Sequence, residues 1–398
     1  MTGLGQESAD AEFERLAARY RPIFDEIAVG EAQRERDGVA PHEQLRWLIG
    51  AGFAGLRIPR ELGGEQARLS TVLRLIAELA VADVNLAHVW RNHFSFVEDR
   101  LYDRRDPRSD EWLARLGRGE IVGGGWSEPG AAGTAGTIST RIARDGDDWV
   151  LDGVKYYSTG SVYARWSTVL ALDPDGTEVV VLVDTGSPGV RIGDDWDGFG
   201  QRLTGSGSVA YEGVRVPSDR VFAYATRYSY QRQFYQSTLN ALLVGVGRAI
   251  ERDGAAALRA RVRSHRNATV PTPTDDPELL EVLGSVSAAV YAAQTAFERS
   301  LVLTDALIER AGAADAGDDA GLGHASVQAV AQTQLVATTA VLDAATRVFD
   351  ALGASGTSHR LGLDRHWRNA RTLASHNPRV YVARLLGDAL VNGRDLTA

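Results

Sequence analysis

The hydrophobic periodicity of the chain changes twice, and this pattern limits the possible folds more than any other feature. From residue 11 to about residue 116, apolar side chains recur at helical spacing. Between about 121 and 222, short apolar runs such as 179–183 alternate with turn sequences rich in Asp, Gly and Pro, as in β-hairpins. Helical spacing returns after Arg227. The sequence predicts an α+β fold with an N-terminal helical domain over 1–120, a central antiparallel β-domain over 121–226 and a C-terminal helical bundle over 227–398.

The C-terminal bundle is expected to contain long helices at 234–263, 277–311, 326–352 and 378–391, with a solvated connector at 312–323. Apolar residues such as Val330, Leu335, Val336, Leu342 and Val348 form faces wider than one side of a bundle must bury. We therefore expect the chain to assemble as a homotetramer.

The composition excludes several classes of protein. With 398 residues, 44% of them hydrophobic and 24% charged, the chain is typical of a globular protein of two or three packed units. Its net charge of -9 argues against general binding to nucleic acids or anionic membranes. The absence of cysteine excludes disulfides, thiolate nucleophiles and iron–sulfur clusters. Neither a secretion-type start nor an apolar run of about 18 residues occurs, so we expect a cytoplasmic protein.

Generic nucleotide and metal motifs are weak. Gly205–Ala210 fits a loose Gly-x-Gly-x-x-Ala pattern, but a strand-like run at 211–216 follows where a dinucleotide fold needs a helix, so we expect a turn. The chain has neither a P-loop sequence nor a His-Glu-x-x-His motif. His88 and His93 are five residues apart, about 500° around a helix, and so do not share a face that could bind a metal. We expect no metal site.

A dense polar segment near the C-terminal end points to a functional site. Residues 363–372, with the sequence LDRHWRNART, follow a turn-like sequence at 353–358, and they lack the pattern of an ordinary amphipathic helix. Ser375, His376, Asn377 and Pro378 come next. Cations, amides and imidazoles in one segment can hold an anionic cofactor beside a proton-transfer group.

Motifs spread over most of the chain resemble the acyl-CoA dehydrogenase fold of flavoproteins. They are GLRIPRELGG at 55–64, WSEP at 126–129 and KYYSTG at 155–160. A second set, DDW at 194–196, GQRLT at 200–204 and the segment 364–378, is similar to the group D flavin-dependent monooxygenases, the branch that includes dibenzothiophene monooxygenase.

This resemblance implies a two-component monooxygenase. Such an enzyme receives reduced FMN or FAD from a separate NAD(P)H:flavin reductase, reacts it with O2 to a flavin hydroperoxide, and oxygenates an aromatic or heteroatom-bearing small molecule. The chain has no convincing pyridine-nucleotide fingerprint, which agrees with an external reductase. The resemblance also implies a tetramer.

The absence of a glutamate base distinguishes this sequence from acyl-CoA dehydrogenases and favours a monooxygenase. An acyl-CoA dehydrogenase needs a glutamate as general base to remove an unactivated α-proton. The last glutamate of this chain is Glu309, and no Asp or Glu occurs between Asp219 and Glu251, so both segments in which the family places its base lack an acid. Two alternatives stay open: an acyl-CoA dehydrogenase or oxidase with an unrecognised base, and a non-catalytic member of the fold.

The resemblance and the needs of a flat, amphiphilic flavin suggest individual site residues. The catalytic candidates are His93, Thr159 and His376. The candidates for binding the flavin ring are Trp126, Ser127, Tyr157 and Thr159, and those for its phosphate are Arg263, Arg266, Arg368 and Asn369, in part from different subunits. The substrate candidates are Trp196 and Gly124, where the relative carries an asparagine whose loss leaves room near the ring. His88, His366 and Trp367 are interpreted as structural or supporting residues.

Overall fold

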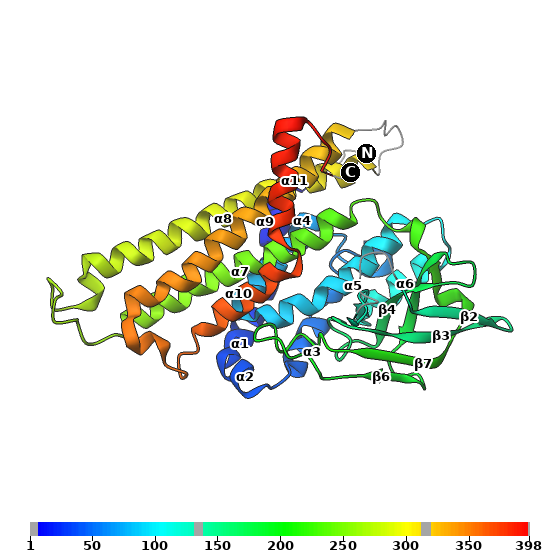
Figure 1. The fold of residues 1–398 in the computed structure, drawn as a ribbon, viewed down its shortest axis with the longest axis horizontal. Helices are drawn as coiled ribbons and strands as arrows, with labels where there is room; N and C mark the ends of the chain where they lie inside the picture. Colours follow the sequence, from blue (N-terminus) through cyan, green and yellow to red (C-terminus); the bar gives the residue numbers. More distant parts are fainter. Residues whose placement is uncertain (1–6, 131–137, 312–319, 397–398) are drawn as a thin grey trace.

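A computed structural model describes residues 7–130, 138–311 and 320–396, and Figure 1 shows the arrangement of its elements. The N-terminal helices are α1 (Ala9–Ala28), α2 (Glu31–Asp37), α3 (His42–Gly50), α4 (Leu69–Ala82), α5 (Val84–Tyr102) and α6 (Arg108–Gly117). Every residue of α5 from Val84 to Arg100 is buried, although many of them are polar. Buried polar groups need partners, and α5 finds them in the sheet and in the bundle.

The central domain is one sheet. Its strands are β1 (Val122–Gly125), β2 (Arg141–Asp145), β3 (Asp148–Lys155), β4 (Trp166–Leu172), β5 (Glu178–Asp184), β6 (Val190–Ile192), β7 (Val209–Val216) and β8 (Val221–Ala223). They are ordered β6-β7-β3-β2-β4-β5-β8, with β1 added beside β4. Most pairs are antiparallel, as predicted, but β1 and β4 run parallel, as does one bridge between β2 and β4, so the sheet is mixed.

The C-terminal helices are α7 (Gln231–Arg259), α8 (Pro277–Ala311), α9 (Ala320–Leu352), α10 (Asp364–His376) and α11 (Arg379–Asn392). α8 has the predicted bounds, whereas α7 ends earlier and α9 begins earlier than expected. The predicted connector lies mostly outside the described residues, and its last four residues belong to α9. Short 3-10 helices lie at Phe53–Gly55, Arg60–Leu62, Ser218–Arg220, Tyr224–Thr226, Pro273–Asp275 and Gly353–Thr357.

The polar segment that we did not expect to be an ordinary helix is α10. Its buried face carries Arg365, His366 and Asn369 beside apolar residues. The sequence lacked a plain apolar stripe because these polar side chains bind buried partners on other elements, as described below.

Helix α8 is the one described helix long and apolar enough to cross a membrane by length and composition alone, which is weak evidence. It packs lengthwise against α7 and α9 (Figure 1). Its outer face leaves Leu280, Tyr291 and Val302 exposed. Of the apolar residues from which we predicted self-association, Val330 and Val348 are buried within the chain, whereas Val336 is exposed.

Candidate active site

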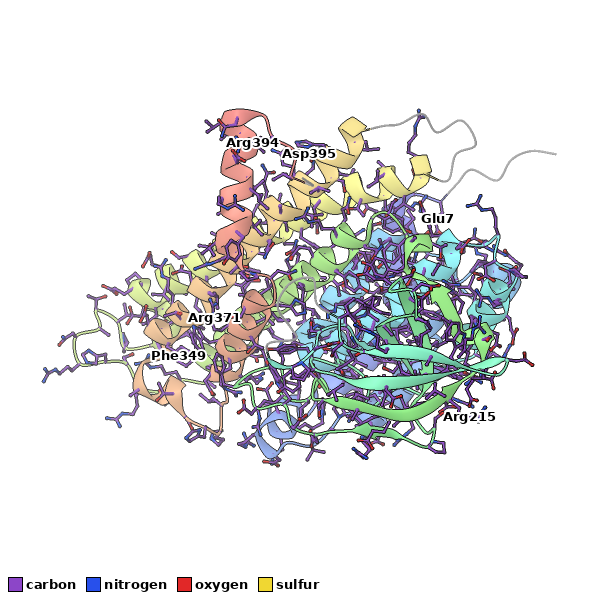
Figure 2. All side chains as sticks on the ribbon, turned by 45° about the vertical axis from the view of Figure 1, so that its right-hand side comes forward. Glu7, Arg215, Phe349, Arg371, Arg394 and Asp395 are labelled. Carbon is purple, nitrogen blue, oxygen red and sulfur yellow. The ribbon has the colours of Figure 1, made fainter. Side chains whose placement is uncertain are left out.

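A cavity of about 330 Å³ lies where α5, the β-domain and α10 meet. Figure 2 shows Arg371, on α10, at this junction between the bundle and the sheet. The cavity is lined by His88, Ser127, Tyr157, Thr159, Trp196, Gln201, Ser206, Thr372, Leu373, Ser375 and His376. None of these described lining residues is an Asp or a Glu.

A chain of hydrogen bonds through Gln201 and Asn369 connects His88 to Glu35. Its Nδ1 lies 2.8 Å from Oε1 of Gln201, and Nε2 of Gln201 donates to Oδ1 of Asn369 at 3.2 Å. Asn369 in turn donates from Nδ2 to Glu35 at 2.7 Å. Glu35 is held by Arg368 at 3.0 Å. Because an ionised carboxylate only accepts, the direction of every bond in this chain follows from Glu35.

This direction determines the tautomer of His88. Since the amide nitrogen of Gln201 is used by Asn369, the oxygen of Gln201 must face His88, and the proton of the imidazole lies on Nδ1. The buried Nε2 has no described partner and therefore presents a free lone pair. Burial, together with the charge of Arg91 and the nearby His376, lowers the pKa of His88 well below its usual value. His88 is thus a neutral imidazole whose Nε2 can accept a hydrogen bond.

Backbone strain is concentrated at the same cavity. Three described residues other than glycine have positive φ, and two of them, Tyr157 (58°) and Gln201 (56°), line the cavity. Such conformations cost energy and persist where the surroundings impose them. For Gln201, the backbone N–H donates to Oδ1 of Asn369 at 2.6 Å. The preceding Gly200 approaches α10 so closely that a Cβ atom would lie 2.2 Å from the carbonyl oxygen of Arg368.

Thr159 is placed by α5. Its carbonyl oxygen accepts from Nδ2 of Asn92 at 2.9 Å, and the same amide group donates to the carbonyl of Gly124 at 3.0 Å. The Thr159 hydroxyl contacts the hydroxyl of Ser206 at 2.8 Å on the cavity wall. Asn92 therefore joins the central helix to β1 and to the segment after β3.

Two of the sequence motifs meet beside the cavity. Lys155, at the end of β3, and Glu128, just after β1, form a buried ion pair of 2.7 Å. Glu128 also accepts hydrogen bonds from the backbone and hydroxyl groups of Ser139 and Thr140. Burial alone would raise the pKa of Glu128, but these bonds, together with the bond from Lys155, outweigh it and lower the pKa. The pair fixes the backbone that carries Ser127 to the cavity.

An aromatic wall faces these polar groups. The rings of Tyr157 and Trp196 meet edge to face with centroids 5.8 Å apart, and Nε1 of Trp196 donates to the carbonyl of Gly200 at 3.1 Å. A cavity of a few hundred Å³ with an aromatic wall and a few converging polar groups suits a flat heteroaromatic ring.

His376 also lines the cavity, with its ring centroid 6.5 Å from that of His88. Its Nε2 is 2.8 Å from Nη1 of Arg91, and its Nδ1 is 3.3 Å from Oδ1 of Asn377. Because Arg91 can only donate, His376 is neutral with its proton on Nδ1. Desolvation of the imidazole ring and the charge of Arg91 lower the pKa of His376.

Comparison with known proteins identifies the family. Residues 123–214 match the acyl-CoA dehydrogenase middle domain, and residues 237–379 match an acyl-CoA dehydrogenase C-terminal domain. Dibenzothiophene monooxygenase of Mycolicibacterium goodii is 26% identical over 377 residues, which cover 91% of this chain and 90% of the relative. The chain belongs to the flavin-dependent monooxygenases of the acyl-CoA dehydrogenase fold. A probable FMNH2-dependent monooxygenase of Pseudomonas putida, SfnC, is 24% identical, with 94% of each chain covered.

A solved structure supports the same family. FMN-bound TdsC from Paenibacillus sp. A11-2 has a TM-score of 0.88 and 27% identity, and the match covers 96% of this chain and 98% of TdsC. A further TdsC structure, similar at a TM-score of 0.87, holds FMN together with indole.

In this monooxygenase, His93 lies away from the cavity. Its Nε2 is 2.9 Å from the carbonyl oxygen of Ala54, and its ring packs edge to face against Trp90. His88, which we had interpreted as structural, lines the cavity instead. The helical spacing showed that the two histidines face different directions, but it could not show which of them faces the sheet.

Other predicted residues line the cavity or support it. Ser127, Tyr157, Thr159, Trp196 and His376 line it. Asn369 is buried behind Gln201, and Arg368 is bound to Glu35 and Asp364, so neither is a free phosphate ligand. The indole of Trp126 packs under the guanidinium of Arg227, 4.3 Å from its ring centroid.

The expected extra room at Gly124 is absent. A Cβ atom at this position would lie 2.3 Å from the hydroxyl of Thr168, on the neighbouring strand β4. Glycine is required there by strand packing. Gly124 is also not among the described residues that line the cavity.

Arg263 and Arg266 line a different cavity, between the end of α7 and the end of α9. In Figure 1 this segment lies at the far end of the bundle from the sheet. Within one chain these arginines therefore do not reach the candidate site.

Proposed function

We propose that this protein is the oxygenase of a two-component system, which uses reduced FMN from a separate NAD(P)H:flavin reductase and O2 to oxygenate an aromatic or heteroatom-bearing small molecule. The observation that carries the proposal is the cavity lined by the neutral His88, whose Nε2 has no described partner, and by no described carboxylate. FMN is preferred over FAD because FMN occurs in the names of two relatives.

The residues present fit a flavin. Ser127, Thr159 and Ser206 offer hydroxyl groups for the polar edge of a ring, and Tyr157 with Trp196 offers an aromatic wall. Reduced flavin supplies the electrons that activate O2. The chain's own part is to orient the ring, to exclude water and to offer Nε2 of His88 as a hydrogen-bond acceptor. The phosphate ligands Arg263 and Arg266 would come from another subunit of a homotetramer.

A dehydrogenase lacks its base here. Removal of an α-proton needs a carboxylate at the substrate, and no described lining residue supplies one. A neutral imidazole with a strongly lowered pKa is too weak a base for this task.

The decisive experiment is a stopped-flow mix of the anaerobic complex with reduced FMN and oxygenated buffer. We expect a transient absorbing species before oxidised FMN appears, and no bleaching of oxidised FMN by a chain-length series of acyl-CoA. Failure to bind FMN, or stoichiometric bleaching by an acyl-CoA without a reductase, would contradict the proposal.

A further inference from the structure

Arg91, on α5, is a buried cation that lacks an anionic partner. Its side chain is 7% exposed, and its Nε is buried without a hydrogen-bond partner among the described residues. Nη1 contacts only a neutral acceptor, Nε2 of His376. No carboxylate in the described part of the chain pairs with this guanidinium, and none contributes to the shift of its pKa.

The other buried arginines show how unusual this is. Of the four arginines buried among the described residues, three have carboxylates: Arg100 has Asp106 at 3.7 Å, Arg227 has Asp99 at 2.9 Å, and Arg365 has both Glu31 at 2.8 Å and Asp253 at 2.6 Å. A guanidinium does not lose its proton in a protein, and an unpaired buried charge costs several kcal/mol. A chain that pairs three of these cations and leaves the fourth unpaired indicates that an external anion completes the site.

Arg91 contacts residues that line two cavities. Its contact His376 lines the candidate active-site cavity, and Tyr235, whose ring centroid lies 5.6 Å from the guanidinium carbon, lines a neighbouring cavity of about 340 Å³. Arg91 is itself in the described lining of neither cavity and lies behind His376 and Tyr235, between the two. The neighbouring cavity has Arg232 in its lining, and the lining described for either cavity contains no carboxylate. In a chain with a net charge of -9, this is a locally cationic space.

We propose that the substrate of this monooxygenase is an organic anion, an aromatic or heteroatom-bearing molecule with a carboxylate or sulfonate-type group that Arg91 binds at the wall between the two cavities. This inference rests on the proposed function and narrows its substrate class. A planar guanidinium suits a planar or tetrahedral oxyanion through paired N–H donors. Nε, which has no described protein partner, is then satisfied by the ligand.

The test uses pairs of probes that have the same shape and differ in charge. Benzoate with benzamide, benzenesulfonate with benzenesulfonamide, and indole-3-carboxylate with its amide are titrated calorimetrically into the full-length protein, both FMN-saturated and FMN-free. At least one anion is expected to bind ten times or more tightly than its neutral partner, since a charge-assisted bond is worth roughly a factor of ten to a hundred. Arg91→Met is expected to bind the two members within a factor of three, and Arg91→Lys to keep part of the preference.

Arg371→Met is the matched control. Arg371 is also near the cavity, where it donates to Ser375, but it is only half-buried. If the general positive potential attracted anions, both variants would lose the preference, whereas we expect Arg371→Met to keep it. Melting temperatures of all variants confirm that they are folded.

Three results would overturn the inference: no anion preference in any pair, a preference that persists in Arg91→Met, or a loss of FMN affinity of tenfold or more in Arg91→Met with unchanged anion binding. The last result would assign Arg91 to the cofactor. FMN binding is measured separately, so a protein that binds no FMN would refute the proposed function, while the FMN-free titration would still decide the role of Arg91.

Discussion

The Nδ1 atom of His88 lies 2.8 Å from the Oε1 atom of Gln201, and this contact determines which nitrogen of the imidazole carries the proton. Gln201 is itself oriented by Asn369, and Asn369 by the carboxylate of Glu35. The charge of one glutamate thus specifies the protonation of a histidine three hydrogen bonds away.

Removal of the Gln201 amide is expected to disturb the reaction with O2 without loss of the cofactor. Gln201→Leu leaves His88 free to change tautomer, and the loss of one buried hydrogen bond corresponds to about tenfold. We expect hydrogen peroxide release from the complex with reduced FMN to rise by that factor, with FMN affinity within threefold of wild type. Gln66→Leu is the control, because Gln66 also has a positive φ (54°) but lies away from the cavity. An unchanged release rate in Gln201→Leu would remove Gln201 from this role.

Substitution of His88 is expected to affect catalysis, whereas substitution of His93, also on α5, is expected to affect stability. His88→Ala removes a hydrogen-bonding group at the cavity, so coupling of O2 use to product is expected to fall by about two orders of magnitude or more. His93→Ala is expected to retain coupling but to lower the free energy of unfolding by about 1–3 kcal/mol, because a buried hydrogen bond and packing are lost. Peroxide assays and urea unfolding of both variants distinguish the roles, and the reverse pattern would restore His93 as the catalytic candidate.

Stability is expected to decline as the pH falls from about 6.5 toward 4. Burial lowers the pKa of His93 to about 4, below the value of about 6.5 in an unfolded chain, so the unfolded chain binds more protons in this window. The contribution of His93 is complete above pH 6.5 and is lost with a slope of up to about 1.4 kcal/mol per pH unit as the pH falls. Urea unfolding of His93→Gln is expected to show a correspondingly shallower slope. His359→Gln, at an exposed position, is expected to keep the wild-type slope.

Loss of the charge of Arg227 is expected to lower the free energy of unfolding of the ligand-free protein, whereas loss of the charge of Arg91 is not. Arg227→Met leaves the buried Asp99 without its partner, which costs about 3–5 kcal/mol. Arg91→Met leaves no carboxylate unpaired among the described residues, so its free energy of unfolding is expected to be unchanged or higher. Chemical unfolding of both variants is the measurement. A loss of 3 kcal/mol or more in Arg91→Met would show that Arg91 is paired in the folded protein.

Self-association is expected to depend on α8. Tyr291 is 72% exposed and Val302 59% exposed on its outer face, an unusual arrangement for a long apolar helix. The double variant Tyr291→Arg, Val302→Arg is expected to shift the tetramer toward smaller species in analytical ultracentrifugation, and to weaken FMN binding if another subunit supplies Arg263 or Arg266. Val29→Arg, at a position 67% exposed after α1, is the control. A wild-type protein that is monomeric at micromolar concentration would contradict the prediction.

The sequence predicted the order of helices and strands because each element repeats its own apolar spacing. It predicted the family from motifs that include 126–129 and 155–160, and in the structure these two motifs meet through the buried pair of Glu128 and Lys155. It did not predict α10 as a helix, since the buried polar residues Arg365 and His366 interrupt the apolar stripe. These residues bind Glu31 and Asp253, which are distant in the sequence.

The sequence could not predict the direction in which individual side chains point. His88 and His93 are indistinguishable as residue types, and only the bond from Gln201, 113 residues away, shows which one faces the cavity. The pairing of Arg368, predicted as a phosphate ligand, with Glu35 could not be predicted for a similar reason, because Glu35 is remote in sequence. Arg91 was not predicted as a site residue, because its neighbours in the sequence do not show that its charge is buried and unpaired.

The contacts of α10 also have a consequence for the order in which the protein folds. Asn369 and Arg365 bind Glu35 and Glu31 across 334 residues of sequence, and the closure of such long loops comes late and slowly. During synthesis, the N-terminal helices and the sheet emerge long before the residue that orients Gln201. The nascent chain can therefore acquire most of its fold while His88 still lacks a defined tautomer, and catalytic competence arrives only when the last contacts close.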